Sequence, residues 1–438
     1  MSKKIVVIDM NHGGIPISQK LSEIGFSVTA IDVYDKLDLK IISNLNKDYG
    51  VDVIKKPIAV DEFDFIVAPL HLNPNYAMLK SAREKDKKII SHHEIVGIIL
   101  SNDERIKNIK FIEISGTKAK TSTAFILANI ISQKFCVILH TSYGLIYIKN
   151  GKSIQIDKLS ITPGNILQVI DRTICFSPTF YIFEVSIGFT GYSDFNILTT
   201  LNNDVLIAAN SKYESDAILQ TMHNIKNSTL LINSDIYHRI NLNIFECNNT
   251  NLITFNENND VMKMNVQSNY DLNSYRTALS ASIAASVELG IEFDVIKSTI
   301  SKFKGIDGRM LKKNFKGRIL IDNSNSGMDV QSVKSAFKFA LTFLKNDKKI
   351  IFVLGIESKT VCEGLDVEEL IKFIEKQRAF IDKLIWVCDS KELKNSNILE
   401  RFKNIVINTT SSHENGLSIA FNNTKKGDII LSCVKCFR

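Results

Sequence analysis

The chain has 438 residues, of which 45% are hydrophobic and 23% are charged, a composition typical of globular proteins with substantial cores. At roughly 150 residues per domain, this length predicts two to four domains, with three as the central expectation. Mean hydropathy is +0.03, and no charge-free apolar run approaches the roughly 20 residues of a membrane span. The apolar run after Lys4 is too short for a secretory signal. Composition therefore argues against disordered, fibrous, membrane and secreted classes.

Charge and cysteine content suggest the setting. The net charge of +7 comes from 54 Lys and Arg against 47 Asp and Glu, without a dense basic block. Nucleic-acid binding favours a basic patch with interleaved aromatics, so an anionic small substrate is the preferred partner, with no nucleic acid and no membrane. Seven scattered cysteines indicate a reducing cytoplasm. The one CxxC, Cys433 to Cys436, supplies at most half a zinc site, and ordinary terminal cysteines are the simpler interpretation.

Short β-branched runs alternate with longer amphipathic segments along the chain, which is typical of α/β layers. A helix over Ile17–Ile24 is expected to end at Gly25. In residues 1–105 the strands are expected at Lys4–Asp9, Val28–Val33, Phe63–Ala68 and Lys88–Ser91. This first block is predicted to be a small doubly wound sheet.

The same alternation continues in two further blocks, 106–308 and 309–438. Helices are expected at Ala124–Ser132, Ser274–Leu289, Val330–Leu344 and Val367–Gln377. Strands of the second block are expected at Lys110–Ser115, Cys136–Leu139, Tyr181–Ser186, Asn196–Leu201 and Thr229–Ile232. Strands of the third are expected at Arg318–Asp322, Lys349–Leu354, Lys383–Val387, Lys403–Ile407 and Asp428–Ser432. The prediction is an α/β protein with domains 1–105, 106–308 and 309–438.

The most informative stretch joins a buried strand to a helix. It reads Gly116, Thr117, Lys118, Ala119, Lys120, Thr121 and Ser122. In this context, backbone N–H groups and a helix N-terminus can hold polyphosphate, Lys120 can neutralise the β- and γ-phosphates, and Thr121 or Ser122 can bind Mg²⁺. A regular P-loop would have glycine where Ile114 and Ala119 stand. The plainer alternative is a surface turn rich in lysine and threonine.

This loop resembles the G-T-x-G-K-[TS]-[TS] loop of the Mur ligase family of ATP-dependent synthetases. Glu184, at the end of the strand YIFEVS, resembles the family's magnesium-binding glutamate, and Gly308-Arg309 resembles the pair that opens its C-terminal domain. The resemblance implies a central P-loop ATPase domain flanked by two Rossmann-like domains, with ATP and Mg²⁺ as cofactors. It also implies activation of a substrate carboxylate as an acyl phosphate, with catalytic roles for Lys120, Glu184 and Arg309.

Further landmarks support the resemblance, and some depart from it. Asn273 resembles the family's adenine-contacting asparagine, and Asp322 resembles the acid that holds ribose. Val205 replaces the histidine expected after Asp204, and Gln220 stands where many members carry a carbamylated lysine. Each position also has a structural alternative. Glu184 can be a salt-bridged edge residue, Arg309 a hinge charge, and Asn273 and Asp204 helix caps or turn residues.

Polar residues follow several strands of the first block. Asp9 and His12 come after the first strand, where doubly wound folds bind ligands, and the segment is not G-x-G-x-x-G, which argues against a dinucleotide. His71 and the pair His92-His93 follow later strands, so a shared polar face is expected, although these residues can be simple loop polars. With the terminal S-C-V-K-C-F-R, these motifs resemble an archaeal branch of the family that completes a nickel tetrapyrrole.

That branch implies the chemistry of ring closure. A ring carbon would attack the activated propionate and form a carbocyclic ketone, with nickel arriving inside the substrate. A base is required, and the candidates are His12, which we rank first, His92 and His93. Two alternatives remain open. One is an amide-forming ligase that adds an amino acid to a cell-wall or cofactor precursor, and the other is a non-catalytic nucleotide-binding protein.

Overall fold

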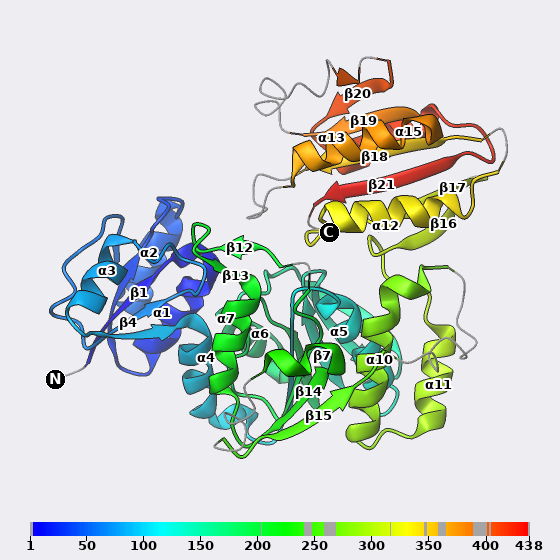
Figure 1. Ribbon diagram of the computed structural model, residues 1–438. Helices are drawn as coiled ribbons and strands as arrows, with labels where there is room; N and C mark the ends of the chain where they lie inside the picture. Colours follow the sequence, from blue (N-terminus) through cyan, green and yellow to red (C-terminus); the bar gives the residue numbers. More distant parts are fainter. Residues whose placement is uncertain are drawn as a thin grey trace. The chain divides into compact units, whose positions relative to one another are not determined.

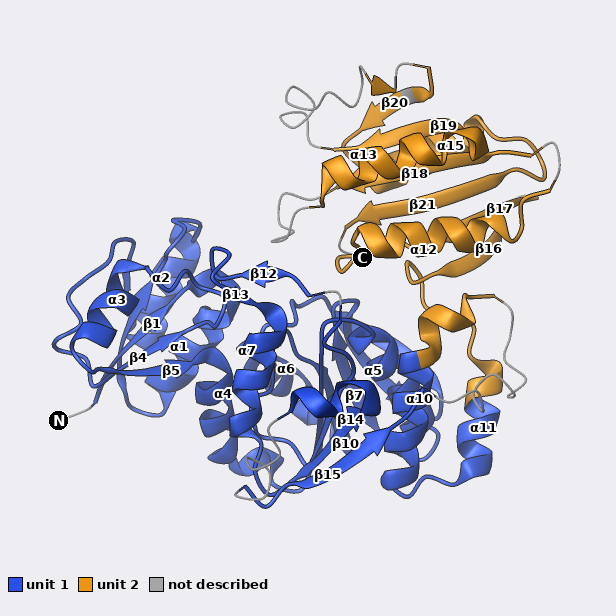
Figure 2. Cartoon of the chain, in the orientation of Figure 1, with its two compact units in different colours: residues 1–261, 277–299 blue, residues 262–276, 300–438 orange. Residues whose placement is uncertain are grey.

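The computed structural model describes residues 3–202, 204–240, 248–257, 269–315, 317–345, 348–357, 365–388, 401–402 and 404–436 (Figure 1). Within these residues the chain forms sheets of five, eight and six strands and a separate pair of short strands. The first two large sheets belong to one compact unit, residues 1–261 and 277–299, and the third to a second unit, residues 262–276 and 300–438 (Figure 2). No described helix combines the length and apolarity that a bilayer crossing demands.

The first sheet is parallel, with the strand order β3-β2-β1-β4-β5. Its apolar strands are buried on both faces because helices α1, α2 and α4 cover one and α3 covers the other. The order reverses beside β1, so the carboxyl ends of β1 and β4 form the switch point where such folds bind ligands. The bounds are β1 Lys4–Ile8, α1 Ile15–Glu23, β2 Ser27–Ile31, α2 Leu39–Tyr49, β3 Asp52–Ile54, β4 Phe65–Ala68, α3 Ala77–Glu84, β5 Lys88–Ser91 and α4 His92–Ser101.

The central sheet has the order β15-β14-β11-β6-β10-β7-β8-β9, in which the pairs β7–β8 and β8–β9 are antiparallel and all other neighbours are parallel. Helix α5 is apolar around most of its surface because it packs with both the sheet and α10. Its strands are β6 Lys110–Ser115, β7 Val137–Thr141, β8 Gly144–Lys149, β9 Lys152–Asp157, β10 Phe180–Glu184, β11 Phe195–Leu198, β14 Thr229–Asn233 and β15 Asn251–Phe255. The other elements are α5 Lys120–Ile131, α6 Asn165–Thr173, the paired strands β12 Leu206–Ile207 and β13 Lys212–Tyr213, α7 Glu214–Thr221, α10 Leu272–Glu288 and α11 Phe293–Lys302.

One carboxyl group lies inside the central sheet. Glu113 of β6 is fully buried, and its Oε2 accepts a hydrogen bond from Thr190 N at 2.8 Å. Burial raises the pKa of Glu113 to about 7, although the hydrogen bonds from Thr190 act against this shift. The group therefore titrates close to neutral pH in the folded chain.

The third sheet has the order β16-β17-β21-β18-β19-β20, and only the edge strand β16 is antiparallel to its neighbour. Strand β21 is central and buried along its whole length, which accounts for the continuous run IILSCVK. Cys433 and Cys436 are therefore core residues, and neither forms a disulfide with another described cysteine. The bounds are β16 Leu311–Phe315, β17 Arg318–Asp322, α12 Val330–Leu341, β18 Ile350–Ile356, α13 Val367–Lys376, β19 Ile381–Val387, β20 Val406–Thr410, α15 His413–Asn422 and β21 Ile429–Lys435.

The predicted elements agree with this architecture and differ at some ends. Strands β5, β6 and β17 have the predicted bounds. The helix expected from Ala124 begins four residues earlier, at Lys120, because the phosphate loop turns directly into it. The strand expected at Lys403–Ile407 is observed at Val406–Thr410, and Lys403 lies outside the described residues. The domain boundaries at 105/106 and 308/309 remain predictions.

Candidate active site

The predicted phosphate loop joins β6 to α5 in the middle of the central sheet. Gly116 has a φ of 138°, and a Cβ there would collide with Thr199 Oγ1, so this position requires glycine. Ala119 has φ 66° and ψ −6°, in the left-handed region where glycine is usual. The alanine is thus accommodated in the backbone conformation that the family's glycine favours.

The loop is fixed against the segment that follows β11. Thr117 N donates to Thr200 O at 2.9 Å, and Lys118 N donates to Thr200 Oγ1 at 3.0 Å. The first turn of α5 has no side-chain cap from Ala119, and the geometry of a helix leaves the amides of that turn without intrahelical acceptors. The N-terminus of α5, with Lys120 to Ser122, therefore offers a polarised N–H cluster suited to an anion.

The ammonium of Lys120 lies over this loop. Its Nζ donates to Gly116 O and lies 3.7 Å from Glu214 Oε1, and both charged side chains are largely buried. Glu214, the first residue of α7, was not identified from the sequence, because no local motif marks it. A carboxylate and a loop carbonyl thus keep Lys120 folded onto the loop, in reach of any phosphate bound there.

Glu184 and Thr121, the two predicted magnesium ligands, meet directly. Thr121 Oγ1 donates to Glu184 Oε1 at 2.9 Å, and Ser142 N donates to Glu184 Oε2 at 2.9 Å. Ser142 Oγ is 3.2 Å from Thr121 Oγ1, a partner that sequence reasoning missed although it follows the neighbouring strand β7. A buried carboxylate beside hydroxyl oxygens is a donor set that suits a hard cation such as Mg²⁺.

Asp204, which precedes the departure at Val205, and Gln220, which replaces the family's lysine, lie at the two ends of α7. Asp204 Oδ1 accepts from Ser215 N at 3.0 Å, so this carboxylate tethers the start of α7 as a turn residue would. Gln220, in the last turn of α7, lines a cavity of about 420 Å³ together with Arg83 and Lys212. Burial lowers the pKa of Lys212.

Asn273, Arg309 and Asp322 belong to the second unit, whereas Lys120 and Glu184 belong to the first. Asp322 is buried at the end of β17 and accepts from Gly308 N at 3.2 Å, which holds the turn that carries Arg309. The Arg309 carbonyl accepts from the Tyr275 hydroxyl at 2.9 Å. Asn273 Oδ1 accepts from a side-chain nitrogen of Arg276 at 3.2 Å. The second unit thus brings Arg309 and Asp322 into one local arrangement.

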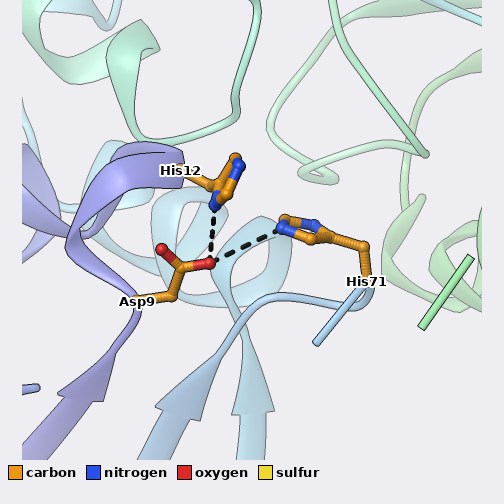
Figure 3. A group of neighbouring side chains, drawn as sticks. All are labelled: Asp9, His12 and His71. Atoms are coloured by element: carbon orange, nitrogen blue, oxygen red, sulfur yellow. Dashed lines mark hydrogen bonds and ion pairs between the residues drawn. The ribbon is translucent and has the colours of Figure 1, made fainter. Parts of the chain in front are cut away.

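A separate polar cluster lies at the switch point of the first sheet (Figure 3). Asp9 is completely buried, with a φ of 75°, and its Oδ2 is 2.6 Å from His12 Nδ1 and 3.6 Å from His71 Nε2. The two imidazole rings meet edge to face, with centroids 4.5 Å apart. Burial alone would raise the pKa of Asp9, but interactions with His12 and His71 hold it well below its usual range.

The two other candidate bases, His92 and His93, each have a ring nitrogen within hydrogen-bond distance of a backbone carbonyl oxygen. His92 Nε2 is 3.0 Å from Ile8 O, and His93 Nε2 is 2.8 Å from Ser186 O. Burial lowers the pKa of both to about 4, so both rings are neutral near pH 7. Of the three candidate bases, only His12 is paired with a carboxylate.

Comparison with known proteins identifies the family to which the chain belongs. Residues 312–436 match the family model described as "Coenzyme F430 synthetase CfbE, C-terminal domain". The coenzyme F(430) synthetase of Methanosarcina acetivorans is 39% identical over 478 aligned residues, which cover 100% of this chain and 99% of that protein. This chain belongs to the coenzyme F(430) synthetase family. The coenzyme F(430) synthetase of Methanocaldococcus jannaschii is 25% identical over 89% of this chain and 92% of its own.

This chain has the Mur ligase fold and is an ATP-dependent ligase of the Mur family. A Yersinia pestis folylpolyglutamate synthase/dihydrofolate synthase, solved with AMPPNP and manganese, superposes with a TM-score of 0.57 at 14% identity, over 78% of this chain and 89% of that one. The MurF ligase of Thermotoga maritima, solved with ADP, gives a TM-score of 0.52 at 13% identity, over 94% and 92%. The predicted family and the three-sheet Mur architecture are confirmed.

Proposed function

We propose that this coenzyme F(430) synthetase uses ATP to activate a propionate carboxylate of a nickel tetrapyrrole and then closes a carbocyclic ring by forming a carbon–carbon bond. The observation that carries this proposal is the 39% identity to the Methanosarcina acetivorans enzyme, which extends over the whole chain rather than over the nucleotide site alone. The intact loop, lysine and glutamate support a catalytic protein over a nucleotide-binding protein without activity. The described cysteines are mostly buried and form no disulfide with one another, which is compatible with a cytoplasmic setting.

In the activation step, a substrate carboxylate oxygen attacks the γ-phosphorus of ATP, and the bond to the β-phosphate oxygen breaks to release ADP. Gly116 to Ser122 would bind the phosphates, and Lys120 would leave Gly116 O to neutralise the charge that develops on them. Thr121 and Glu184 would hold Mg²⁺, which supplies neutralisation of phosphate charge when it is bound. From the family resemblance we extend adenine recognition to Asn273, ribose recognition to Asp322 and contact with the reacting groups to Arg309.

In the closure step, a carbon of the substrate loses a proton, the resulting carbanion attacks the acyl carbon, and phosphate leaves. We propose His12 as the proton acceptor. Its Nδ1 faces the buried Asp9 carboxylate at 2.6 Å, which orients the ring and stabilises its protonated form. An aspartate that is ionised and shielded from water is suited to this supporting role.

The decisive experiment combines the full-length protein with the open-ring nickel precursor, ATP and Mg²⁺. We expect one ADP and one phosphate per turnover, a change in the absorption spectrum, and a product lighter than the precursor by one water. Parallel reactions contain amino acids. If ADP release requires an amine and the product gains an amino acid, the chain forms amides and the ring-closure proposal is wrong.

A further inference from the structure

The cluster of Asp9, His12 and His71 has the composition of a metal centre as well as of a proton-transfer site (Figure 3). We propose that these three side chains bind one divalent transition-metal cation of the zinc, cobalt(II) or nickel(II) class. Two imidazole nitrogens and one carboxylate oxygen form a set that such ions favour, whereas Mg²⁺ prefers oxygen ligands throughout. This site is therefore chemically different from the one proposed at Thr121 and Glu184.

The geometry places one donor atom of each residue around a common point. His12 Nδ1, His71 Nε2 and a carboxylate oxygen of Asp9 all lie within 4.8 Å of one another. Ligands about 2.0–2.1 Å from a tetrahedral zinc ion stand roughly 3.4 Å apart. His71 Nε2 is already 3.6 Å from Asp9 Oδ2, and His12 Nδ1, now at 2.6 Å, would retreat by less than about 1 Å.

The orientation and burial of the donor atoms favour binding of a cation. Asn11 N donates to Asp9 Oδ1 at 3.0 Å, which fixes the carboxylate and leaves Oδ2 directed at the two rings. Asp9 carries its charge in a fully buried position, where an ion of opposite charge offsets the loss of hydration. His71 Nε2 is buried, and its nearest acceptor, Asp9 Oδ2 at 3.6 Å, lies beyond hydrogen-bond distance, so this nitrogen can take a cation without breaking a hydrogen bond.

Three protein ligands leave at least one coordination position for water or for an electron-pair donor of a ligand. The cation would take the imidazole nitrogen of His12 that now faces Asp9. A loaded site and His12 acting as a base therefore exclude each other. That consequence rests on the proposed function, whereas cation binding itself does not.

The test uses the full-length protein after removal of metals with a chelator. Calorimetric titration with Zn²⁺ should give one strong site per chain, and Co²⁺ should give the visible absorption of a tetrahedral complex without the thiolate charge-transfer bands that cysteine ligands would produce. His71→Ala should weaken Zn²⁺ binding at least about tenfold, because even partners of metal ligands contribute that much. The exposed His238 provides the matched control, since His238→Ala should leave affinity and stoichiometry unchanged.

Asp9→Asn is the second variant, and circular dichroism establishes that each variant is folded. If Asp9→Asn does not fold, the comparison of His71→Ala with His238→Ala decides alone, because the partly exposed His71 is a milder change. Absence of a stoichiometric site, or equal affinities in His71→Ala and the parent, overturns the proposal. Ring closure measured with the metal-depleted protein, after the chelator is removed and Mg²⁺ is added back, separates the two proposals, since the metal site can fail while turnover is retained.

Discussion

Replacing Ala119 by glycine should stabilise the protein, which is the opposite of what glycine does in ordinary helices. Ala119 has φ 66° and ψ −6° at the N-cap of α5. A left-handed conformation costs an L-residue roughly 1–2 kcal/mol, and glycine avoids that cost. Glycine loses more backbone entropy on folding, by roughly 0.5–1 kcal/mol. The difference predicts that Ala119→Gly raises the free energy of unfolding by about 0.5–1 kcal/mol.

The matched control lies in the same helix. Ala128 is fully buried in α5, and Ala128→Gly should lower the free energy of unfolding by about 1 kcal/mol or more, because glycine is unfavourable in helix interiors. Urea unfolding of the full-length chain, followed by circular dichroism, measures both variants in parallel. Destabilisation of Ala119→Gly by as much as Ala128→Gly would refute the argument from backbone strain.

Three further predictions concern ionisable groups. Because the folded-state pKa of Glu113 is raised to about 7, its contribution to stability is complete below about pH 4.5 and is lost as the pH rises through 7. Glu113→Gln should remove a cost approaching roughly 3 kcal/mol at alkaline pH, so its unfolding free energy should vary less than the parent's between pH 5 and 9. Parallel pH profiles of the two proteins would contradict this. Lys120→Ala should lower carboxylate-dependent ADP release at least about 100-fold, because it removes charge stabilisation in the transition state. Lys134→Ala is the control, since it alters only the exposed ion pair with Glu292 and should leave the rate unchanged. Equal rates for Lys120→Ala and the parent would eliminate the phosphate-loop assignment. Glu184→Gln should raise the Mg²⁺ concentration needed for half-maximal ADP release by at least about tenfold, and an unchanged Mg²⁺ dependence would remove Glu184 from the metal site.

Features that depend on a short stretch of residues could be predicted from the sequence alone. The phosphate loop and Glu184 stand at the ends of continuous apolar strands, so both the strands and the residues after them could be read directly. Strand β9 escaped prediction because most of its residues are exposed and polar. Helix α2 was also not predicted, although Ile42, Leu45 and Tyr49 recur at helical spacing and pack on the core. The packing of helices against the sheets is a tertiary property that no single segment encodes.

The partners of the predicted site residues were found only in the structure. Glu214 reaches Lys120 and Ser142 reaches Glu184 because the start of α7 and the turn between β7 and β8 approach the loop and strand ends that carry Lys120 and Glu184. Residue spacing does not reveal such pairs. The polar face predicted on the first block did appear in part, since His71 joins Asp9 and His12, whereas His92 and His93 are bound to backbone carbonyls. The histidines differ in burial: His12 and His71 are partly exposed, whereas His92 and His93 are buried.

The interleaved path of the chain determines how the protein can be divided. The second unit takes in residues 262–276 before the chain returns to the first unit for 277–299. Tyr270 bridges to Leu311 at the start of β16, and Asp271 N donates to Met310 O at 3.1 Å. A fragment that began at residue 309 would lack these partners and the ring cluster of Tyr270, Tyr275 and Phe303. The contacts of the C-terminal domain therefore extend to residues 269–276 and 300–308, and a fragment cut at the predicted boundary would not retain them.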